Sequence, residues 1–341
     1  MRAAVYYNNK DIRIEELPRP QISSKEILVK VIASGICGSD VMEWYRIKNA
    51  PRVLGHEIAG EIVEVGTEVS QFSIGQRVFV SHHVPCNECR YCQSGYHTAC
   101  STLRSTNFDP GGFAEYLRVP EANVKNGTLV LPDEVTFEEG TFIEPLGCVI
   151  RGQRVAAVKE GETVLVIGSG ISGLMHIQLA RIKGVSKLIA TDVNEYRLEQ
   201  ALRFGAYTAV DAKEDVADAV RKANDGRLAD KVIVCTAALP AFEQAFESVD
   251  CGGTLLLFAP TAPEVRVPLP LYEVYFKSAR IVFSYAAVND DLTEAIELLR
   301  SKRFDALGMV THCFGLEETR KGFDLVAQAD RSIKVIIMPQ E

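Results

Sequence analysis

The segment ETVLVIGSGISGL, residues 162–174, constrains the fold of this chain more than any other stretch. An apolar run leads directly into a G-x-G-x-x-G turn whose glycines are Gly168, Gly170 and Gly173. A helix-like stretch follows, and a second apolar run, KLIATD, ends at Asp192. A strand, a glycine turn, a helix, a second strand and an acid in this order predict a βαβ unit that binds a dinucleotide.

The same pattern predicts how the dinucleotide would bind. The glycines let the pyrophosphate approach the N-terminus of the helix that begins near Ile171, where free N–H groups attract anions. Asp192 would accept hydrogen bonds from the adenosine ribose and repel a 2′-phosphate, which favours NAD over NADP. Arg197 leaves an alternative open, because its guanidinium would either receive a phosphate or lie on a solvated helix face.

The alternation of strands and helices continues beyond this unit. DKVIVCT, GGTLLLFAP and ARIVFSY read as further apolar strands, with a helical segment AFEQAFESV among them. This order predicts a doubly wound parallel sheet, whose ligands lie beyond the carboxyl ends of the strands. Thr236 and Phe258 would then lie near the cofactor, although both fit equally well as plain core or loop residues.

Length and composition limit the classes of protein to consider. A chain of 341 residues is expected to form two domains. The net charge of −8 argues against a nucleic-acid partner. The N-terminus lacks the apolar stretch of a signal peptide, and the uncharged run 163–180 reads as strand, turn and helix rather than as a membrane span. We therefore expect a cytoplasmic protein without a membrane partner.

Four cysteines fall within fifteen residues, in CNECRYCQSGYHTAC, spaced C-x2-C-x2-C-x7-C. Tetrahedral zinc takes four thiolates, and short spacings let one loop supply them all. A complete shell has no open position for a substrate, so this would be a structural zinc site. The alternative is a set of reduced thiols without metal. The predicted ligands are Cys86, Cys89, Cys92 and Cys100.

A second, open metal site is predicted from residues that are separated in the sequence. Cys37 lies in SGICGSD, His56 in LGHEIAGE, and Glu144 in FIEPLGC. Three protein ligands leave the fourth position of a zinc ion for water or substrate, which is the arrangement of a catalytic site. Taken singly, each residue also fits a purely structural role, as a buried thiol, a hydrogen-bonded polar side chain or a turn residue.

Taken together, these motifs resemble the zinc-dependent medium-chain alcohol dehydrogenases, in particular the sorbitol (polyol) and threonine dehydrogenase branch. The resemblance rests on GICGSD, GHEIAGE, the four-cysteine loop, GGFAEY, IEPLG and the glycine turn, in the order of the family. It implies an α/β protein with a GroES-like β-rich catalytic domain over 1–150, a Rossmann domain over 151–285, and a C-terminal segment, 286–341, that returns to the first domain. It also implies a homodimer or homotetramer.

The resemblance assigns roles around the open site. Cys37, His56 and Glu144 match the ligands of the catalytic zinc. Glu57 matches the acid that approaches or exchanges onto the metal in some members. Asp40 matches the carboxylate that orients the ligand histidine.

Further matches and departures concern the substrate side. Ser39 matches the hydroxyl that passes the substrate proton outward, and Cys148 falls where the family places a residue against the nicotinamide ring, or else is a buried inert thiol. Met42 stands where many relatives have the histidine of the proton relay. Ser284 stands where sorbitol-type relatives have an arginine, which makes sorbitol a doubtful substrate.

The resulting expectation is an oxidoreductase with two Zn²⁺ ions per subunit that transfers a hydride between a secondary alcohol or polyol, or the matching ketone, and NAD(H). Zinc would lower the pKa of the alcohol, and the nicotinamide would take the hydride. Two alternatives remain at this point. One is a zinc-free quinone or enone reductase of the same superfamily, and the other is a non-catalytic redox or metal-sensing protein on this scaffold.

Overall fold

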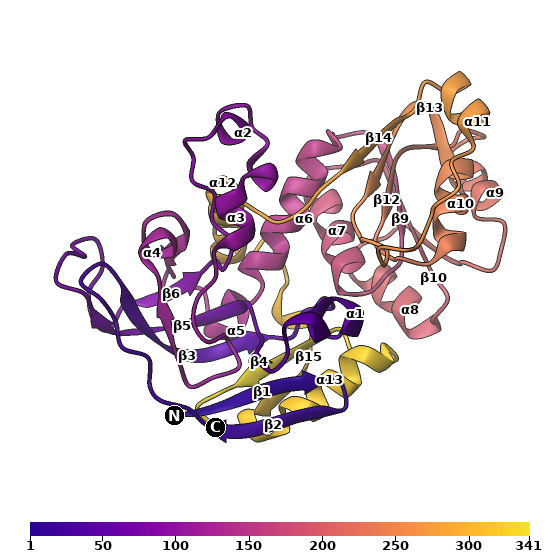
Figure 1. The fold of residues 1–341 in the computed structure, drawn as a ribbon. Helices are drawn as coiled ribbons and strands as arrows, with labels where there is room; N and C mark the ends of the chain where they lie inside the picture. Colours follow the sequence, from indigo (N-terminus) through magenta and orange to yellow (C-terminus); the bar gives the residue numbers. More distant parts are fainter. The chain divides into compact units, whose positions relative to one another are not determined.

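The computed structural model describes all 341 residues, which divide into two compact units (Figure 1). The first unit comprises Met1–Gly147 and Ala286–Glu341, and the second comprises Cys148–Tyr285. One boundary falls inside helix α6 (Ile143–Val155). Both units combine strands and helices, which confirms the predicted α/β class.

The second unit contains one six-stranded sheet in which every pairing is parallel. Its strand order is β11-β10-β9-β12-β13-β14. In chain order these strands are β9 (Thr163–Ile167), β10 (Lys187–Asp192), β11 (Thr208–Asp211), β12 (Ala229–Val234), β13 (Val249–Leu257) and β14 (Arg280–Phe283). The order is that of the Rossmann fold, and the direction of winding reverses between β9 and β12, where dinucleotides bind.

Helices connect these strands, as the alternating sequence pattern predicts. They are α7 (Ile171–Ile182), α8 (Glu195–Arg203), α9 (Val216–Ala223), α10 (Leu239–Ser248) and α11 (Leu271–Phe276). The central strand β9 is buried along its whole length, as expected for a parallel strand covered on both faces. Asn194 and Asp215 cap α8 and α9 by accepting hydrogen bonds from backbone N–H groups of the first turn.

The first unit is built mainly from antiparallel strands in two sheets. The three-stranded sheet has the order β2-β1-β4, with β1 (Arg2–Asn8), β2 (Asp11–Glu16) and β4 (Arg52–Val53). The larger sheet has the order β15-β16-β3-β5-β6-β8, and β7 also pairs with β3. Its strands are β3 (Ile27–Gly35), β5 (Glu57–Val65), β6 (Arg77–Val80), β7 (Tyr116–Val119), β8 (Thr128–Val130), β15 (Val310–Gly315) and β16 (Lys334–Met338).

Short helices fill the connections of this unit. They are α1 (Glu43–Arg46), η1 (Ile47–Asn49), α2 (Arg90–Gln93), η2 (His97–Ala99), α3 (Ser101–Ser105), α4 (Glu121–Gly127), α5 (Phe137–Gly140), α12 (Asn289–Arg300), η3 (Leu307–Met309), η4 (Leu316–Glu318) and α13 (Thr319–Gln328). Several of them lie in the loops at the strand ends, next to the side chains of the candidate sites described below.

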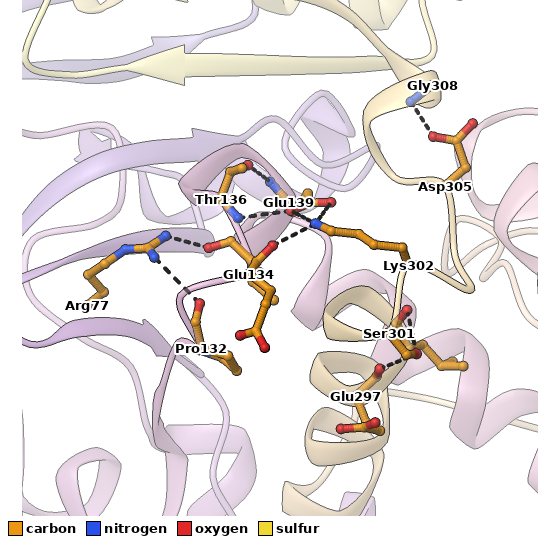
Figure 2. A network of polar contacts seen from close by, with 12 residues as sticks. Arg77, Pro132, Glu134, Thr136, Glu139, Glu297, Ser301, Lys302, Asp305 and Gly308 are labelled. Carbon is orange, nitrogen blue, oxygen red and sulfur yellow. Dashed lines mark hydrogen bonds and ion pairs between the residues drawn. The ribbon is translucent and has the colours of Figure 1, made fainter.

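The C-terminal segment joins the first unit in two ways. Strand β16 pairs antiparallel with β3, with Ile337 opposite Ser34. Figure 2 shows the second link, in which Lys302 reaches the buried carboxylate of Glu139 on α5, with its Nζ 2.7 Å from both carboxylate oxygens. The same carboxylate accepts the backbone N–H of Thr136 in a capping box. Residues Ala286–Glu341 thus belong to the first unit, and their strands β15 and β16 extend the sheet that carries the site described next.

The run 163–180, considered above as a membrane span, forms β9 and most of α7. No helix in the structure has the length and apolar character that crossing a membrane requires.

Candidate active site and metal centres

The four cysteines of the loop converge on one point. Their Sγ atoms lie within 4.8 Å of one another. Individual separations are 3.5 Å for Cys89–Cys92, 3.6 Å for Cys86–Cys100 and 4.0 Å for Cys86–Cys92. A tetrahedron with Zn–S bonds of 2.3 Å has edges of about 3.8 Å, whereas a disulfide is about 2.05 Å long. The spacing therefore fits four thiolates around one zinc ion.

The protonation behaviour of the thiols supports this fit. A hydrogen bond from the backbone N–H of Glu88 is the main cause that lowers the pKa of Cys86. Burial acts to raise the pKa of Cys100, but backbone N–H donors, that of Cys86 first, outweigh it and lower the pKa to about 6. Burial raises the pKa of Cys92 to about 12. The surrounding N–H groups therefore favour the thiolate that zinc requires at Cys86 and Cys100, whereas burial opposes it at Cys92.

A second set of potential ligands lies at the ends of β3 and β5. The side-chain donor atoms of Cys37, His56 and Glu57 lie within 4.8 Å of one another. Cys37 follows β3, and Glu57 is the first residue of β5, which pairs with β3 so that Gly35 lies opposite Glu57. The pairing of two adjacent strands thus brings together GICGSD and GHEIAGE, as the open-site prediction requires. We call these three residues the mixed cluster.

Asp40 orients the histidine of the mixed cluster. Its fully buried carboxylate lies 3.4 Å from Nδ1 of His56 and accepts the backbone N–H of Cys37 at 3.1 Å. Burial opposes charge on both side chains. The positive charge on His56 nevertheless lowers the pKa of Asp40, and the Asp40 carboxylate raises the pKa of His56 well above its usual value. With Nδ1 engaged, Nε2 of His56 is the nitrogen left for a metal.

The carboxylate of the mixed cluster is that of Glu57, and it is paired with a lysine. The ammonium of Lys334 on β16 forms an ion pair with Glu57, and both side chains are 2% exposed. A side chain at Gly35 would collide with this pair, so glycine is required there. Glu144, the third predicted ligand, is buried on α6, and its carboxylate is not among the donor atoms grouped within 4.8 Å.

Ser39 lies beside the mixed cluster, with its Oγ 3.4 Å from Sγ of Cys37. The guanidinium of Arg46 donates to this Oγ at 2.8 Å and to the backbone carbonyl of Ser39 at 3.0 Å. Met42 carries no proton-accepting group, and a guanidinium stays charged at every relevant pH. The Ser39 hydroxyl therefore accepts a hydrogen bond from a permanent donor, and neither Met42 nor Arg46 can take a proton from it.

In the second unit, the glycine turn has the geometry expected of a dinucleotide site. Gly168 has φ of +91°, a conformation that other residues rarely adopt. A side chain at Gly173 would collide with the backbone carbonyl of Gly168. Helix α7 begins at Ile171, with Gly170 as its N-cap, and its first N–H groups have no side-chain cap. An anion is the natural partner for such a helix end.

Asp192 ends β10 beside this turn. Its Oδ2 accepts the backbone N–H of Ser169 at 2.8 Å, and its Oδ1 accepts that of Asn194 at 3.0 Å. Arg197 on α8 lies 3.9 Å from the Asp192 carboxylate and next to Gly170. Each carboxylate oxygen keeps a lone pair for a ribose hydroxyl, while the guanidinium lies close enough to the turn to meet a phosphate.

The comparisons with known proteins agree with this geometry. Residues 23–132 match the family model of the alcohol dehydrogenase GroES-like domain, and residues 172–301 match that of zinc-binding dehydrogenases. The chain is 32% identical to a sorbitol dehydrogenase of Bacillus subtilis, covering 99% of this chain and 97% of that protein. It belongs to the zinc-dependent medium-chain alcohol dehydrogenase family. The resemblance inferred from the motifs, including the GroES-like and Rossmann domains, is confirmed.

Two further proteins show the breadth of the likeness. An L-threonine 3-dehydrogenase of an Enterobacter species is 30% identical over 96% of both chains. The crystal structure of a zinc-binding dehydrogenase from Sinorhizobium meliloti, described as putative and bound to NADP, superposes with a TM-score of 0.89 at 26% identity, covering 99% of each chain. This dehydrogenase is therefore an oxidoreductase of a family that uses zinc and a nicotinamide cofactor.

The remaining cofactor predictions concern residues of the second unit. Thr236 follows β12 and lies against Gly168. A Cβ atom added at Gly168 would lie 3.3 Å from the Cβ of Thr236. Phe258 follows β13 and packs edge-on against His176 of α7, with ring centroids 4.6 Å apart. Cys148 is half-buried on α6. The contacts place Thr236 at the turn, whereas those of Phe258 are with the protein core.

The sequence analysis of this dehydrogenase missed several residues near the mixed cluster. Lys334 is the first residue of the apolar strand β16 and follows Ile333, which is itself a signal, because a lysine buried among apolar residues needs a partner. His82 and His83 follow β6, and the ring of His82 lies 4.7 Å from that of His56. Burial lowers the pKa of His82 well below its usual value and that of His83 to about 4, so both rings are neutral at pH 7.

Proposed function

We propose that this chain is a zinc-dependent dehydrogenase that transfers a hydride between a secondary alcohol or polyol and NAD, and that it performs the reverse reaction on the ketone. The observation that carries the proposal is the mixed cluster, in which a thiol, an imidazole and a carboxylate approach one point in a chain that also has a Rossmann glycine turn. A set with three protein donors leaves one position of a zinc ion for substrate.

Zinc bound there would act as a Lewis acid on the substrate oxygen. The chain supplies the rest of the chemistry in our proposal. Asp40 fixes the tautomer and orientation of His56, and Cys37 provides the soft ligand. In alcohol oxidation, Ser39 Oγ accepts the hydrogen of the substrate hydroxyl. Ser39 passes its own proton on to water or to the cofactor ribose, because Arg46 already donates to Ser39 Oγ and cannot accept a proton.

Two carboxylates compete for the third ligand position. Glu57 belongs to the mixed cluster but is held by Lys334, whereas Glu144 is the carboxylate that we predicted from its apolar surroundings. We propose that Cys37, His56 and Glu144 would hold the metal and that Glu57 would be an alternative ligand if Lys334 released its carboxylate. The four-thiol loop would hold the second zinc ion, in a purely structural role.

The preference for NAD rests on Asp192, whose charge opposes a 2′-phosphate. The NADP-bound relative shows that the family also accommodates the phosphorylated cofactor. Asp192→Ala should lower the ratio of kcat/KM for NAD to that for NADP about tenfold or more, while Arg197→Ala should weaken both cofactors. An unchanged ratio in Asp192→Ala would remove Asp192 from cofactor selection.

We also propose that the dehydrogenase is a homodimer or homotetramer. The edge strand β14 and the neighbouring α11 carry a group of strongly exposed apolar side chains: Leu271, Tyr272, Tyr275, Phe276 and Phe283. Exposed apolar patches next to an unpaired sheet edge are typical of an interface. Light scattering after size-exclusion chromatography should show an oligomer that Phe283→Glu shifts toward monomer. A monomeric wild-type protein would contradict this part.

The experiment that tests the proposed function is reduction of NAD by a panel of secondary alcohols and polyols, with zinc content measured on the same sample. Activity that disappears with removal of the mixed-cluster zinc and returns with zinc supports the proposal. Activity on quinones or enones that is indifferent to zinc, or zinc binding without any turnover of the panel, would replace it with one of the two alternatives considered from the sequence.

A further inference from the structure

Arg46 is a positively charged side chain fixed beside the mixed cluster. Its guanidinium donates to the Ser39 carbonyl, to Ser39 Oγ and, at 3.1 Å, to the carboxylate of Asp40. The side chain is only 15% exposed. Three hydrogen bonds, to the residues two and three positions beyond Cys37, hold this charge beside the mixed cluster.

Arg52 is a second guanidinium close by, and it has no partner. It lies on β4, four residues before His56, and is half-buried. No hydrogen bond and no ion pair engages its guanidinium in the structure. A partly buried charge with five unused N–H donors is unfavourable until it meets an anion.

Strand register and hydrogen bonds indicate that the guanidinium groups of Arg46 and Arg52 lie in the same region of the first unit. Arg52 lies directly opposite Tyr6 of β1, so the two side chains share one face of the sheet. The hydroxyl of Tyr6 donates to Asn9, which in turn donates to the Val41 carbonyl and to the Glu43 carboxylate at the start of α1. This chain of contacts ties the face that carries Arg52 to the segment that carries Arg46.

Electrostatic effects agree with that placement. Burial and then the charge of Arg46 lower the pKa of Arg52.

The carboxylates near Arg52 have other partners. Asp40 pairs with Arg46 and His56, Glu57 pairs with Lys334, and Glu43 accepts the backbone N–H of Asn9. None of these carboxylates pairs with Arg52, whose guanidinium remains without an anion. A neutral alcohol would leave it unpaired, whereas a carboxylate matches the fork of N–H donors on a guanidinium.

We propose that Arg52 binds a carboxylate of the substrate, with Arg46 fixed beside it as a supporting charge, so that the substrate is a hydroxy acid or sugar acid and not a neutral polyol. This inference rests on the proposed function and narrows its substrate class. Arg52 makes the direct contact because its donors are unused, and Arg46 keeps its three internal hydrogen bonds.

The test uses pairs of ligands that differ only in the anionic group: 3-hydroxybutyrate against 1,3-butanediol, and gluconate against sorbitol. Binding to the zinc-loaded chain with NADH present is measured by calorimetry, and kcat/KM with NAD is measured for each ligand that turns over. We expect the acid of at least one pair to bind roughly 10- to 100-fold tighter than its neutral counterpart. Arg52→Met should abolish this difference, and Arg52→Lys should restore part of it.

The matched control is Arg13→Met, which removes an exposed arginine of the same unit that pairs with Asp11. It should leave the preference for the acid unchanged. Equal binding within every pair by the wild-type chain, or a preference that survives in Arg52→Met, overturns the inference even if neutral alcohols reduce NAD. A weaker affinity for NADH in Arg52→Met, with the acid preference intact, would assign the arginine to the cofactor pyrophosphate and also overturn it.

Discussion

The two candidate metal centres of the first unit use different chemistry to hold their donors in place. In the four-thiol loop, the sulfur atoms are organised by backbone N–H groups of the same fifteen residues, such as those of Cys86 and Cys89. In the mixed cluster, the organising groups are side chains of other segments. Asp40 holds His56, and Lys334, 277 residues away along the chain, holds Glu57.

This difference separates a centre that only stabilises from one suited to react. Four thiolates complete the shell of a zinc ion and leave no position for a substrate. The mixed cluster brings fewer donors, keeps one carboxylate in an ion pair, and has the Ser39 hydroxyl and the neutral His82 ring beside it.

The variant His56→Ala should show the largest difference between the two metal centres. Loss of the imidazole removes a ligand of the mixed cluster, so hydride transfer should fall by roughly 10³-fold or more. Zinc content should drop from two ions per chain to one, with little change in the melting temperature. Steady-state assays and elemental analysis of one preparation measure both quantities. Two ions still bound would show that the imidazole is not a ligand.

Lys334→Met tests whether the mixed cluster is adjustable. Without the ammonium, the buried Glu57 carboxylate is unpaired, and the free energy of unfolding of the zinc-free chain should fall by about 3–5 kcal/mol. Zinc should offset part of this loss, because Glu57 is then free to bind it. Denaturant unfolding with and without zinc measures the difference.

Lys302→Met is the comparison for this prediction, because its partner Glu139 is also buried but is not among the donor atoms grouped with Cys37 and His56. Zinc should not offset the loss in that variant. Equal zinc rescue of Lys302→Met and Lys334→Met would contradict an exchange of Glu57 onto the metal.

Cys89→Ser tests the four-thiol loop. Removal of one thiolate should weaken zinc binding in the loop by about a hundredfold or more and increase hydrogen exchange over residues 86–100, because the loop has few other contacts. Hydride transfer per mixed-cluster zinc should change much less. Exchange rates that match the wild type in a chain with one zinc would show that the loop is stable without its metal.

The smallest expected difference between the two centres is in the rate at which a chelator removes their zinc. A bidentate chelator reaches a zinc ion with a vacant position faster than one enclosed by four thiolates, by about tenfold or more in rate. Activity should therefore be lost before the loop zinc leaves, and a thiol-reactive dye should report the second phase. Simultaneous loss of both ions would indicate that the two centres are equally accessible.

The sequence was most informative where the determinants are local. The spacing of the four cysteines predicts a sulfur cluster, and the glycine turn with Asp192 predicts a βαβ unit, because in both cases the interacting residues are adjacent in the chain or separated by one helix. The pairing of β3 with β5 explains why Cys37 and His56 could also be chosen correctly as neighbours.

Other features of the site depend on tertiary contacts that no short motif encodes. The ion pair of Glu57 with Lys334 joins β5 to the C-terminal strand, and the hydrogen bond from Arg46 to Ser39 depends on a short helix without periodic pattern. The sequence predicted Glu144 as the third ligand beside Cys37 and His56, with Glu57 as the acid that approaches the metal. In the folded chain, Glu57 is the carboxylate grouped with the thiol and the imidazole.

The most direct test of the account is X-ray diffraction from crystals of the purified protein at the zinc absorption edge. The account predicts two anomalous peaks per chain, one enclosed by Cys86, Cys89, Cys92 and Cys100, and a second within bonding distance of Cys37 Sγ and His56 Nε2. A single peak in the loop, or a second peak bound to neither Cys37 nor His56, would contradict the assignment of the mixed cluster as the reactive centre.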